Sequence, residues 1–347
     1  MAGYKYGKNA VFGSGNTTDN LVGPTFIAGD SNTVSGSATG VFVAGESNTV
    51  NESNQHVALV AAEGCTISGS CSEVAIIAST GSKLRSGSNS AAIIGGMLNN
   101  NTMTNDMDRG AIIGGLLNSH NGRDGVICGG QLNTITAGAD DVFIAGSGNN
   151  VGLGNSKAWC LGTSNTVGDS NARAAFCSWE ATVGAEGNYT IGFGYQPFLA
   201  DHMTFTYGGG KLSSVAGSVQ FSDKLVACQT TDATQTTMVT QRASNNDSIR
   251  IRANSSFMFR ADIVARRTGT QTESAAYEIV GCIKNDAGTT ALQGTITKTV
   301  IAEADAAWDV TAVANNTDDT LDIKVTGKAA TNINWVAKVT LVETNGA

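Results

Sequence analysis

Side chains that could carry out chemistry are few in this sequence and widely separated. His56, His120 and His202 share no motif, and no His-x-His pair suggests a metal site. Three copies of one histidine could meet at a symmetry axis and bind a metal, but an ordinary loop or surface histidine is the simpler interpretation. We therefore expect no metal site and no cofactor.

Paired acids are the second candidate. Asp106 and Asp108 fall in the longest interval between repeats, where the chain should bulge outward. Two carboxylates could hydrolyse a polysaccharide by acid and base catalysis. The repeat places no second acid opposite them, so an exposed polar loop is favoured, and Asp140-Asp141 is interpreted in the same way. No nucleophile elbow, phosphate-binding loop or zinc motif is present, and we expect no catalytic residues.

Arginines gather in the last third of the chain. Arg250 and Arg252 alternate with isoleucines, which is typical of the solvated face of a strand or of ion pairs. Guanidinium groups could instead bind an anionic glycan, and this is the less favoured hypothesis. The arginines concerned are Arg242, Arg250, Arg252, Arg260, Arg266 and Arg267.

The composition excludes several classes of protein. The chain has 347 residues and a formal net charge of −8, which disfavours nucleic-acid binding because that needs a basic surface. Hydrophobic residues make up 41% and recur in register, which argues against disorder. The seven cysteines match neither a disulfide framework nor a zinc pattern, so we expect reduced thiols and folding in a cytoplasm. No signal peptide follows Met1, and no apolar run is long enough to span a bilayer.

A short repeat organises the first half of the chain. Two apolar residues followed by Ala, Gly or Ser recur about every 16 residues, beginning with Phe26-Ile27-Ala28. In this alignment Leu59 occupies the same column as Phe42. Each copy continues through a turn into a second short strand. A coil of two short strands and two turns is the unit of a parallel β-solenoid.

Asparagine recurs at the turn of each copy. Because Asn tolerates left-handed backbone and its side chains can stack in ladders, we expect these residues to adopt the turn conformation and to bond from coil to coil. They are Asn32, Asn48, Asn99, Asn118, Asn133, Asn149 and Asn165. A threonine column follows, from Thr33 to Thr182, and is expected to face solvent. Ice binding needs a flat array with two threonines per coil, so that function is disfavoured.

Side-chain alternation predicts self-association. Neighbouring residues of a strand point to opposite faces, so an apolar pair such as Ile93-Ile94 places one side chain inside the coil and one outside. Strands that are apolar on both faces are usually buried on both faces. Identical solenoids packed around an axis would bury the outer face, and we expect a homotrimer.

From about residue 212 longer alternating runs replace the repeat, as in 277–283, 321–325 and 333–339. Turn sequences rich in Asn, Asp and Gly separate them. Such runs predict an antiparallel β-sandwich. Trp308 and Trp335 could stack on sugars, but both lie within strand patterns, which favours the sandwich core or a subunit seam.

The coil repeat, Val-Phe-Ile-Ala-Gly-x-x-Asn-Thr-Val and its variants through residues 10–192, resembles the short-coil β-rolls of trimeric phage tail fibres and of trimeric autotransporter adhesin heads. Residues 257–267, 275–278, 308–310 and 334–337 are similar to a C-terminal domain of bacteriophage tail fibres. The resemblance implies a trimeric fibre assembled in the host cytoplasm. The adhesin is the weaker match, because no export signal, heptad stalk or membrane anchor accompanies the repeat.

We therefore predict an all-β homotrimer with a parallel β-solenoid followed by an antiparallel β-sandwich tip. The predicted segments are 1–25 (attachment or cap), 26–192 (solenoid shaft), 193–211 (aromatic cap and neck) and 212–347 (receptor-binding tip).

The predicted function is that of a structural, non-enzymatic phage tail fibre located in the virion tail, without membrane insertion. Its N-terminus would attach to a tail or baseplate protein, and its tip would bind a host surface glycan or protein receptor during adsorption. The alternatives are a glycan-degrading tailspike and a cellular trimeric adhesin. Receptor binding is assigned to tip loops at Asn285, Asp286, Asn315, Asn316, Asp318, Asp319 and Asn332.

Overall fold

The computed structural model describes residues 9–85, 90–102, 109–154, 157–168, 174–183, 189–199, 203–212, 215, 217–240, 248–269 and 272–346. Strands, isolated bridges and the turns and loops between them make up these residues. Within them, no helix is long and apolar enough to cross a membrane. The chain divides into two compact units, Met1–Cys177 and Ser178–Ala347, which we describe in turn as unit 1 and unit 2.

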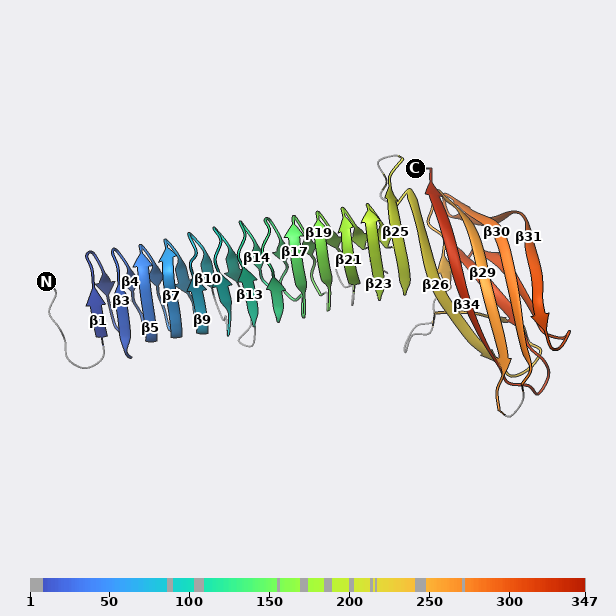
Figure 1. Ribbon diagram of the computed structural model, residues 1–347, viewed down its shortest axis with the longest axis horizontal. Coiled ribbons are helices and arrows are strands. Elements are labelled where there is room, and N and C mark those ends of the chain that lie inside the picture. The colour runs from blue at the N-terminus through green and yellow to red at the C-terminus, as the bar shows by residue number, and fades with distance from the viewer. Residues whose placement is uncertain are drawn as a thin grey trace. The chain divides into compact units, whose positions relative to one another are not determined.

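Unit 1 is a stack of coils, each of which contributes one strand to a first row. Figure 1 shows these strands lying side by side in chain order. They are β1 (Asn9–Phe12), β3 (Thr25–Ala28), β5 (Thr39–Glu46), β7 (Gln55–Glu63), β9 (Ser72–Ile77), β11 (Ala92–Ile94), β13 (Gly110–Ile113), β15 (Gly125–Ile127), β17 (Phe143–Ser147), β19 (Trp159–Thr163) and β21 (Ala174–Trp179), the last of which reaches unit 2. Successive strands pair in parallel, for example Ile93 with Ile112.

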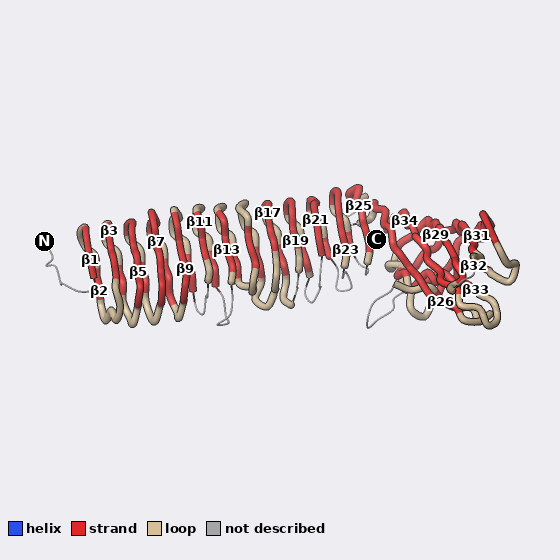
Figure 2. The backbone as a smooth tube through the Cα atoms, turned by 60° about the horizontal axis from the view of Figure 1, so that its bottom comes forward, coloured by secondary structure: helices blue, strands red, loops and turns tan. Residues whose placement is uncertain are grey.

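A second row of shorter strands pairs in parallel beside the first, and loops connect the two rows within each coil (Figure 2). Its members in unit 1 are β2 (Thr17–Thr18), β4 (Thr33–Val34), β6 (Thr49–Val50), β8 (Thr66–Ser68), β10 (Lys83–Arg85), β12 (Asn100–Thr102), β14 (Ser119–His120), β16 (Thr134–Ile135), β18 (Asn150–Val151) and β20 (Thr166–Val167). The expected threonine column is present, since Thr33, Thr49 and Thr66 pair in register and are only half-buried. The predicted β-solenoid is therefore confirmed.

The interior of the coils is a continuous apolar stack. In each first-row strand from β3 to β19, one residue points inward and is fully buried, and these residues are Ile27, Val43, Leu59, Ile76, Ile93, Ile112, Ile127, Ile144 and Cys160. Val34, Val50, Ile67, Leu84, Ile135 and Val151 of the second row complete the core and are also fully buried. Stacking identical positions at the spacing of a β-ladder buries each apolar side chain against those above and below it.

The register corrects the sequence alignment. Leu59 pairs with Val43, and Phe42 pairs with Ala58, so Leu59 belongs to the inward column and not to the column of Phe42. The alignment was wrong by one residue there because both members of each apolar pair fit either face. A shift of one residue exchanges the inner and outer faces of a strand, and only the three-dimensional pairing separates them.

A ladder of buried side-chain amides runs through the turns, as the asparagine pattern predicted. The Nδ2 group of Asn32 donates to Oδ1 of Asn16 (3.1 Å), and Asn48 donates in the same way to Asn32 (3.1 Å). The ladder resumes from Asn118 through Asn133 and Asn149 to Asn165. The Nδ2 groups of Asn32, Asn48 and Asn149 also donate to a backbone carbonyl of the following coil, so these side chains join successive coils twice.

The ladder has two substitutions and one conformational difference from expectation. Cys65 and Ser82 occupy the column between Asn48 and Asn99, where the Cys65 amide donates to Asn48 Oδ1 (3.0 Å) and the Asn99 amide donates to Ser82 Oγ (3.1 Å). The left-handed residue is the one before the asparagine, as at Ser47 (φ 57°), so the expectation that Asn itself adopts that conformation was wrong. The side chain stabilises the turn through hydrogen bonds, which do not require its own φ to be positive.

Glycine is required where coils touch at the turn. Gly130 has a φ of +79°, and a Cβ atom there would lie 1.6 Å from the carbonyl oxygen of Gly146. The same oxygen accepts a hydrogen bond from Asn133 Nδ2 (2.7 Å). A side chain at position 130 would therefore break both the turn and the ladder.

Unit 2 begins with coil strands β22 (Thr182–Val183), β23 (Thr190–Tyr195), β24 (Phe198–Leu199) and β25 (Thr204–Gly210). Strand β25 pairs in parallel with β23 on one side and antiparallel with β26 (Val219–Thr230) on the other. Residues 193–211, predicted to form an aromatic cap and neck, thus include the strand where the parallel ladder becomes antiparallel.

The remainder of unit 2 is an antiparallel two-sheet structure, as predicted. The larger sheet has the order β25, β26, β34 (Ile333–Asn345), β29 (Ser255–Arg267), β30 (Ser274–Asp286) and β31 (Thr289–Glu303). In the smaller sheet β33 (Thr320–Thr326) pairs with β27 (Thr236–Thr237), β28 (Ile249–Arg250) and β32 (Asp309–Asn315).

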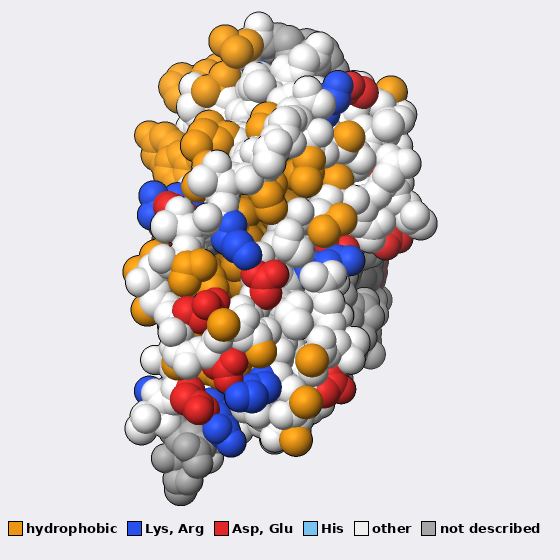
Figure 3. All heavy atoms as spheres, turned by 90° about the vertical axis from the view of Figure 1, so that its right-hand side faces the viewer, with side chains coloured by type: hydrophobic (Ala, Val, Ile, Leu, Met, Phe, Trp, Pro, Cys, Tyr) orange, Lys and Arg blue, Asp and Glu red, His pale blue; other side chains and the backbone are white. Residues whose placement is uncertain are grey.

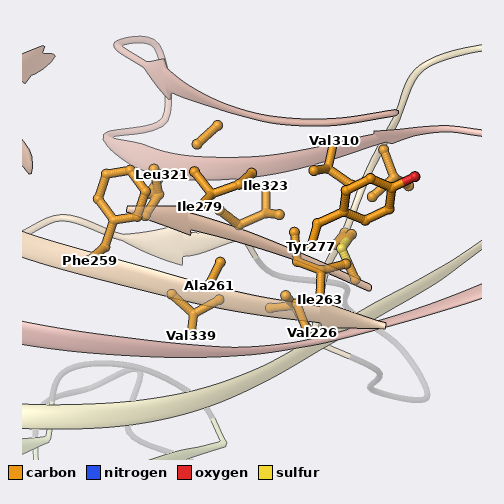
Figure 4. Packing of buried hydrophobic residues seen from close by; sticks show 14 of the residues in the cluster. Val226, Phe259, Ala261, Ile263, Tyr277, Ile279, Val310, Leu321, Ile323 and Val339 are labelled. Atoms are coloured by element: carbon orange, nitrogen blue, oxygen red, sulfur yellow. The ribbon is translucent and has the colours of Figure 1, made fainter. Parts of the chain in front are cut away.

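One apolar core lies between these two sheets. Figure 4 shows Phe259 and Ile263 of the larger sheet facing Leu321, Ile323 and Val310 of the smaller one. Trp308 and Trp335 are buried in the same core with ring centroids 5.8 Å apart, as expected from their strand patterns. The indole Nε1 of Trp335 donates to Thr230 Oγ1 (3.0 Å), which satisfies its buried polar group.

The ladder is expected to contribute measurably to stability. Asn133→Ala removes the acceptor of Asn149 and the donor to Asn118, leaving buried polar groups without partners. We expect the free energy of unfolding to fall by about 3 kcal/mol, measured by denaturant unfolding. Thr134→Ala is the matched control, because Thr134 follows Asn133 in the chain and its side chain is only half-buried. It should lower the free energy of unfolding by about 0.5 kcal/mol or less. Equal effects of the two substitutions would contradict a structural role for the ladder.

Candidate functional site

The structure gathers six of the seven predicted receptor-binding residues at one end of the sandwich. Asn285 and Asp286 end β30, and Asn315, Asn316, Asp318 and Asp319 form the turn between β32 and β33. Thr290 joins the two turns, because its amide donates to Asn316 Oδ1 (2.6 Å) and its hydroxyl to Asp319 Oδ1 (2.7 Å). These residues form one polar surface, which we call the Thr290 cluster.

Members of the Thr290 cluster differ in exposure. Asn285 is buried, donates to the carbonyl of Ile251 (3.1 Å) and accepts from the amide of Gly288 (2.7 Å). Asp286 is exposed beside Lys284, with which it forms an ion pair. Asn285 therefore holds the turn, whereas Asp286 is placed where an external group can reach it.

Asn332 lies apart from the Thr290 cluster. It precedes β34, whose first residue Ile333 pairs with Arg267, while Asn345 at the other end of the strand pairs with Ser255. The Asn332 carbonyl accepts a hydrogen bond from the amide of Thr268 (2.9 Å). The sequence grouped seven loop residues, but the strand directions separate them into two surfaces.

Several other sequence candidates are used within the structure. Arg123 pairs with Asp140, and Lys157 lies 3.7 Å from Asp141, each pair joining successive coils. Asp106 and Asp108 lie outside the described residues, as do Arg242 and His202. Among the residues that the structure describes, no three His, Cys, Asp or Glu side chains form a group that could hold a metal ion.

Arginines of the tip take part in ion pairs, as the strand alternation suggested. Arg260 lies 2.9 Å from Asp262 and 3.0 Å from Glu278 on the outer face of the larger sheet. Arg267 lies 2.7 Å from Glu273. On the face visible in Figure 3, Lys and Arg side chains lie beside Asp and Glu side chains, and hydrophobic side chains gather toward the top. These pairs do not favour an anionic-glycan site at Arg260 or Arg267.

A small pocket in unit 2 is lined by Lys224, Arg250, Arg252 and Glu343, among others. Arg252 pairs with the largely buried Glu343, which also accepts hydrogen bonds from Gln220 (2.6 Å) and Ser255 (3.2 Å). Burial raises the pKa of Glu343, while these donors favour its ionised form. The network ties β26, residue 252, β29 and β34 together beside the last coil, which is a structural role.

The outward face of the first row in unit 1 exposes more apolar side chains than the surface of an ordinary monomer. Each inward residue has an outward neighbour on either side along its strand. We call the residues before it the upstream column, namely Ala10, Phe26, Phe42, Ala58, Ala75, Ala92, Ala111, Val126, Phe143 and Trp159. The residues after it form the downstream column, namely Phe12, Ala28, Ala44, Val60, Ile77, Ile94, Ile113, Cys128, Ala145 and Leu161. Neither column contains a charged or polar side chain other than the Cys128 thiol.

Large side chains of both columns are exposed in the single chain. Phe42 is 41% exposed, Ile94 44%, Ile113 46% and Trp159 61%. Phe26 and Phe42 stack on each other with ring centroids 5.0 Å apart, so the exposed groups are contiguous. Contiguous apolar surface of this length is unusual on a monomer and marks an interaction surface.

Unit 2 carries a comparable apolar row across its larger sheet. Tyr207 pairs with Phe221, Phe221 with Val342, and Val342 with Met258, and all four side chains are exposed. The rings of Tyr207 and Phe221 lie 5.6 Å apart. The sheet of the tip therefore has an outward apolar row of its own.

Three leucines of unit 1 form a further exposed apolar group, which the sequence analysis missed. Leu98, Leu117 and Leu132 occupy the left-handed position before the ladder asparagine in three successive coils, with φ values of 53°, 56° and 57°. Leucine is unfavourable in this conformation, and all three side chains are exposed. The signal was the repeated Gly-Gly-x-Leu-Asn, in which Leu stands where other copies have Ser or Gly.

His120 differs from the expected loop or surface histidine. It lies in the inward column of the second row, where it pairs in register with Ile135, and it is fully buried. Burial lowers the pKa of the imidazole to about 4, because the charged form is poorly solvated inside the coil. His56, in contrast, is exposed, as expected.

Comparisons with known proteins show distant structural similarity to phage tailspike proteins. The tailspike protein of Acinetobacter baumannii phage AM24 aligns over 95% of this chain and 69% of its own, with a TM-score of 0.29 and 9% sequence identity. A tailspike protein of Acinetobacter baumannii bacteriophage Fri1, a capsular polysaccharide depolymerase, aligns over 92% of this chain and 70% of its own, with a TM-score of 0.21 and 8% identity. Likeness at these scores supports no argument about function.

No family model matches the sequence. No curated protein matches it either.

The burial of His120 is expected to make the coil sensitive to acid. The pKa of His120 in the folded chain is about 4, which is below the ordinary value of about 6.5. Its contribution to stability is therefore complete above pH 6.5 and is lost as the pH falls toward 4. The loss should be about 2 kcal/mol at pH 5. Denaturant unfolding at pH 7 and pH 5 measures it.

His120→Ile, which introduces the residue found at position 135, should remove most of this difference between the two pH values. His56→Ala is the matched control at an exposed histidine and should keep the pH difference that His120 causes. Identical pH dependence of the wild-type chain and His120→Ile would contradict the assignment.

Proposed function

We propose that this chain is the structural fibre protein of a phage or phage-like tail. It assembles as a homotrimer, attaches to a tail or baseplate protein through its N-terminal segment, and presents its C-terminal sandwich to a receptor on the host surface. A surface glycan is the favoured receptor class. The role is binding during virion adsorption and not catalysis.

The outward face of unit 1 carries this proposal. Exposed Phe, Ile and Trp side chains continue through successive coils, and hydrophobic surface of this extent is stable in water only when it is covered. Identical chains supply a cover of matching length, because every coil has the same spacing. Self-association is therefore the simplest way to bury both outward columns.

A closed ring suits the arrangement of the two columns, and we propose the smallest such ring, a trimer. In a closed ring, each chain uses one side of its outward face against one neighbour and the other side against the next. The upstream and downstream columns are two such sides, separated by the inward residue. Three tips on one assembly raise the avidity for a host surface even when each site is weak.

The ion pairs of one acid pair support the choice of binding over catalysis in this proposal. Glycoside hydrolysis needs two carboxyl groups placed across the scissile bond with separated pKa values. Asp140 and Asp141, the second of the two acid pairs raised by the sequence, are engaged by Arg123 and Lys157 on neighbouring coils, whereas Asp106 and Asp108 lie outside the described residues. A polysaccharide-degradation assay on host capsule, with release of reducing ends as its readout, tests this part of the proposal directly.

The oligomeric mass of the full chain is expected to equal three chains in dilute buffer, as measured by native mass spectrometry or light scattering. Ile94→Asp should shift the mass toward a single chain, because each copy would have to bury a charge in the outward face. Asn150→Asp is the matched control on an exposed position of the second row and should leave the mass unchanged. A wild-type monomer would overturn the proposal.

Receptor binding is expected to depend on exposed loop side chains and not on the buried one beside them. Asp286→Ala and Asn332→Ala each remove an exposed side chain at one of the two ends of the sandwich. The substitution at the end that binds the receptor should lower the apparent affinity for host cells about tenfold or more, because three sites act together. Both variants should keep the wild-type mass and melting temperature. Asn285→Ala should instead lower the melting temperature, since it removes two hydrogen bonds of the turn. Wild-type binding by both exposed variants would contradict the assignment of the site to these loops.

A further inference from the structure

We infer that the outward face of unit 1 packs against further copies of this chain in parallel and level by level, with the upstream column of one copy against the downstream column of the next. This inference rests on the proposed self-assembly and specifies its partner surface. The evidence for it is the sizes of the side chains in the two columns. The register of the strands shows which upstream and downstream residues lie at the same level.

The two columns vary in opposite directions along the stack. In four consecutive coils a small upstream residue accompanies a large downstream one, and these pairs are Ala58 with Val60, Ala75 with Ile77, Ala92 with Ile94, and Ala111 with Ile113. In three others the order is reversed, namely Phe26 with Ala28, Phe42 with Ala44, and Phe143 with Ala145. Val126 and Cys128 are both of middle size, and Trp159 and Leu161 are both large.

The opposed sizes affect packing only if the upstream column of one chain contacts the downstream column of another. Within one chain both columns point outward and are at least partly exposed, so water could accommodate any combination of sizes. Between chains related by rotation about an axis parallel to the stack, the upstream side of one faces the downstream side of the next at the same level. In the coils with opposed sizes, alanine then meets valine or isoleucine, and phenylalanine meets alanine, so the distance between neighbouring backbones stays nearly constant there.

Other arrangements lose this match. If one chain were reversed, upstream residues would face upstream residues, so the alanines at 58, 75, 92 and 111 would face small residues and leave voids, while aromatic residues would collide. If one chain slid by a single coil, Phe42 would meet Val60, and overpacking of this kind is destabilising. The size changes between coils therefore select one alignment of the copies, as complementary knobs and holes do in other assemblies.

A size exchange within one coil tests the inference. Ala75→Ile places two large residues at one level, and Ile77→Ala places two small ones there. The double variant Ala75→Ile/Ile77→Ala restores one large and one small residue at the same level but in reversed order. The mismatched double variant Ala75→Ile/Ile113→Ala makes the same chemical changes two coils apart.

The measurement is the dissociation midpoint of the full-length assembly, followed by native mass spectrometry over a dilution series. Each single variant is expected to raise the apparent dissociation constant about tenfold or more, because it overpacks or empties one level in every copy. The matched double variant should recover most of the wild-type value, whereas the mismatched one should show the combined loss. Circular dichroism should be the same for all variants, since positions 75 and 77 are at least partly exposed in the single chain.

The outcomes separate this inference from the proposed function. Recovery by the matched variant alone supports the parallel, level-by-level contact. Equal losses in the matched and mismatched variants, with a wild-type chain that still forms an oligomer, would overturn the contact while leaving self-assembly standing. A monomeric wild-type chain would overturn both.

Discussion

Coil-to-coil stacking in fixed register is the constraint on which the rest of this structure depends. Parallel pairing holds each residue directly above its counterpart, and the buried amide ladder from Asn118 to Asn165 joins successive turns at the same level. Because a buried amide without a partner is costly, a coil cannot slide or rotate relative to its neighbours. The inward column then fills the core, and the two outward columns become straight, continuous features of the surface.

Continuity of the first row also explains how two different architectures are joined in one chain. Strand β25 uses one edge for a parallel partner, β23, and the other for an antiparallel partner, β26. An open solenoid end would expose unpaired backbone groups, and this antiparallel strand covers them. A largely buried network lies at strands β26 and β34, where Glu343 binds Arg252 and Gln220. Removing one partner of such a network is costly, because it leaves a charged group buried without its counter-charge.

Many polar residues in this protein form hydrogen bonds or ion pairs that stabilise the fold. Residues that suggest chemistry in a sequence, such as Asp140, Arg260 and Asn285, have partners on neighbouring coils or strands. The exposed surfaces include a long apolar face, which we propose packs against copies of the same chain, and turn residues such as Asp286 and Asp318 at one end of the sandwich. That separation of assembly and recognition suits a protein whose proposed work is to hold a binding surface in place.

From the sequence alone, the periodic pattern determined the β-solenoid, the asparagine ladder, the antiparallel tip and the burial of Trp308 and Trp335. These features follow from local periodicity, which recurs in every copy and is independent of the details of packing. Only the tertiary structure decided which member of each apolar pair faces inward, that His120 belongs to the core, and that Asn332 lies far along the strands from Asn285. The reason is physical: two adjacent apolar side chains fit either face of a strand equally well, and only pairing with neighbouring strands gives each one a direction and a partner.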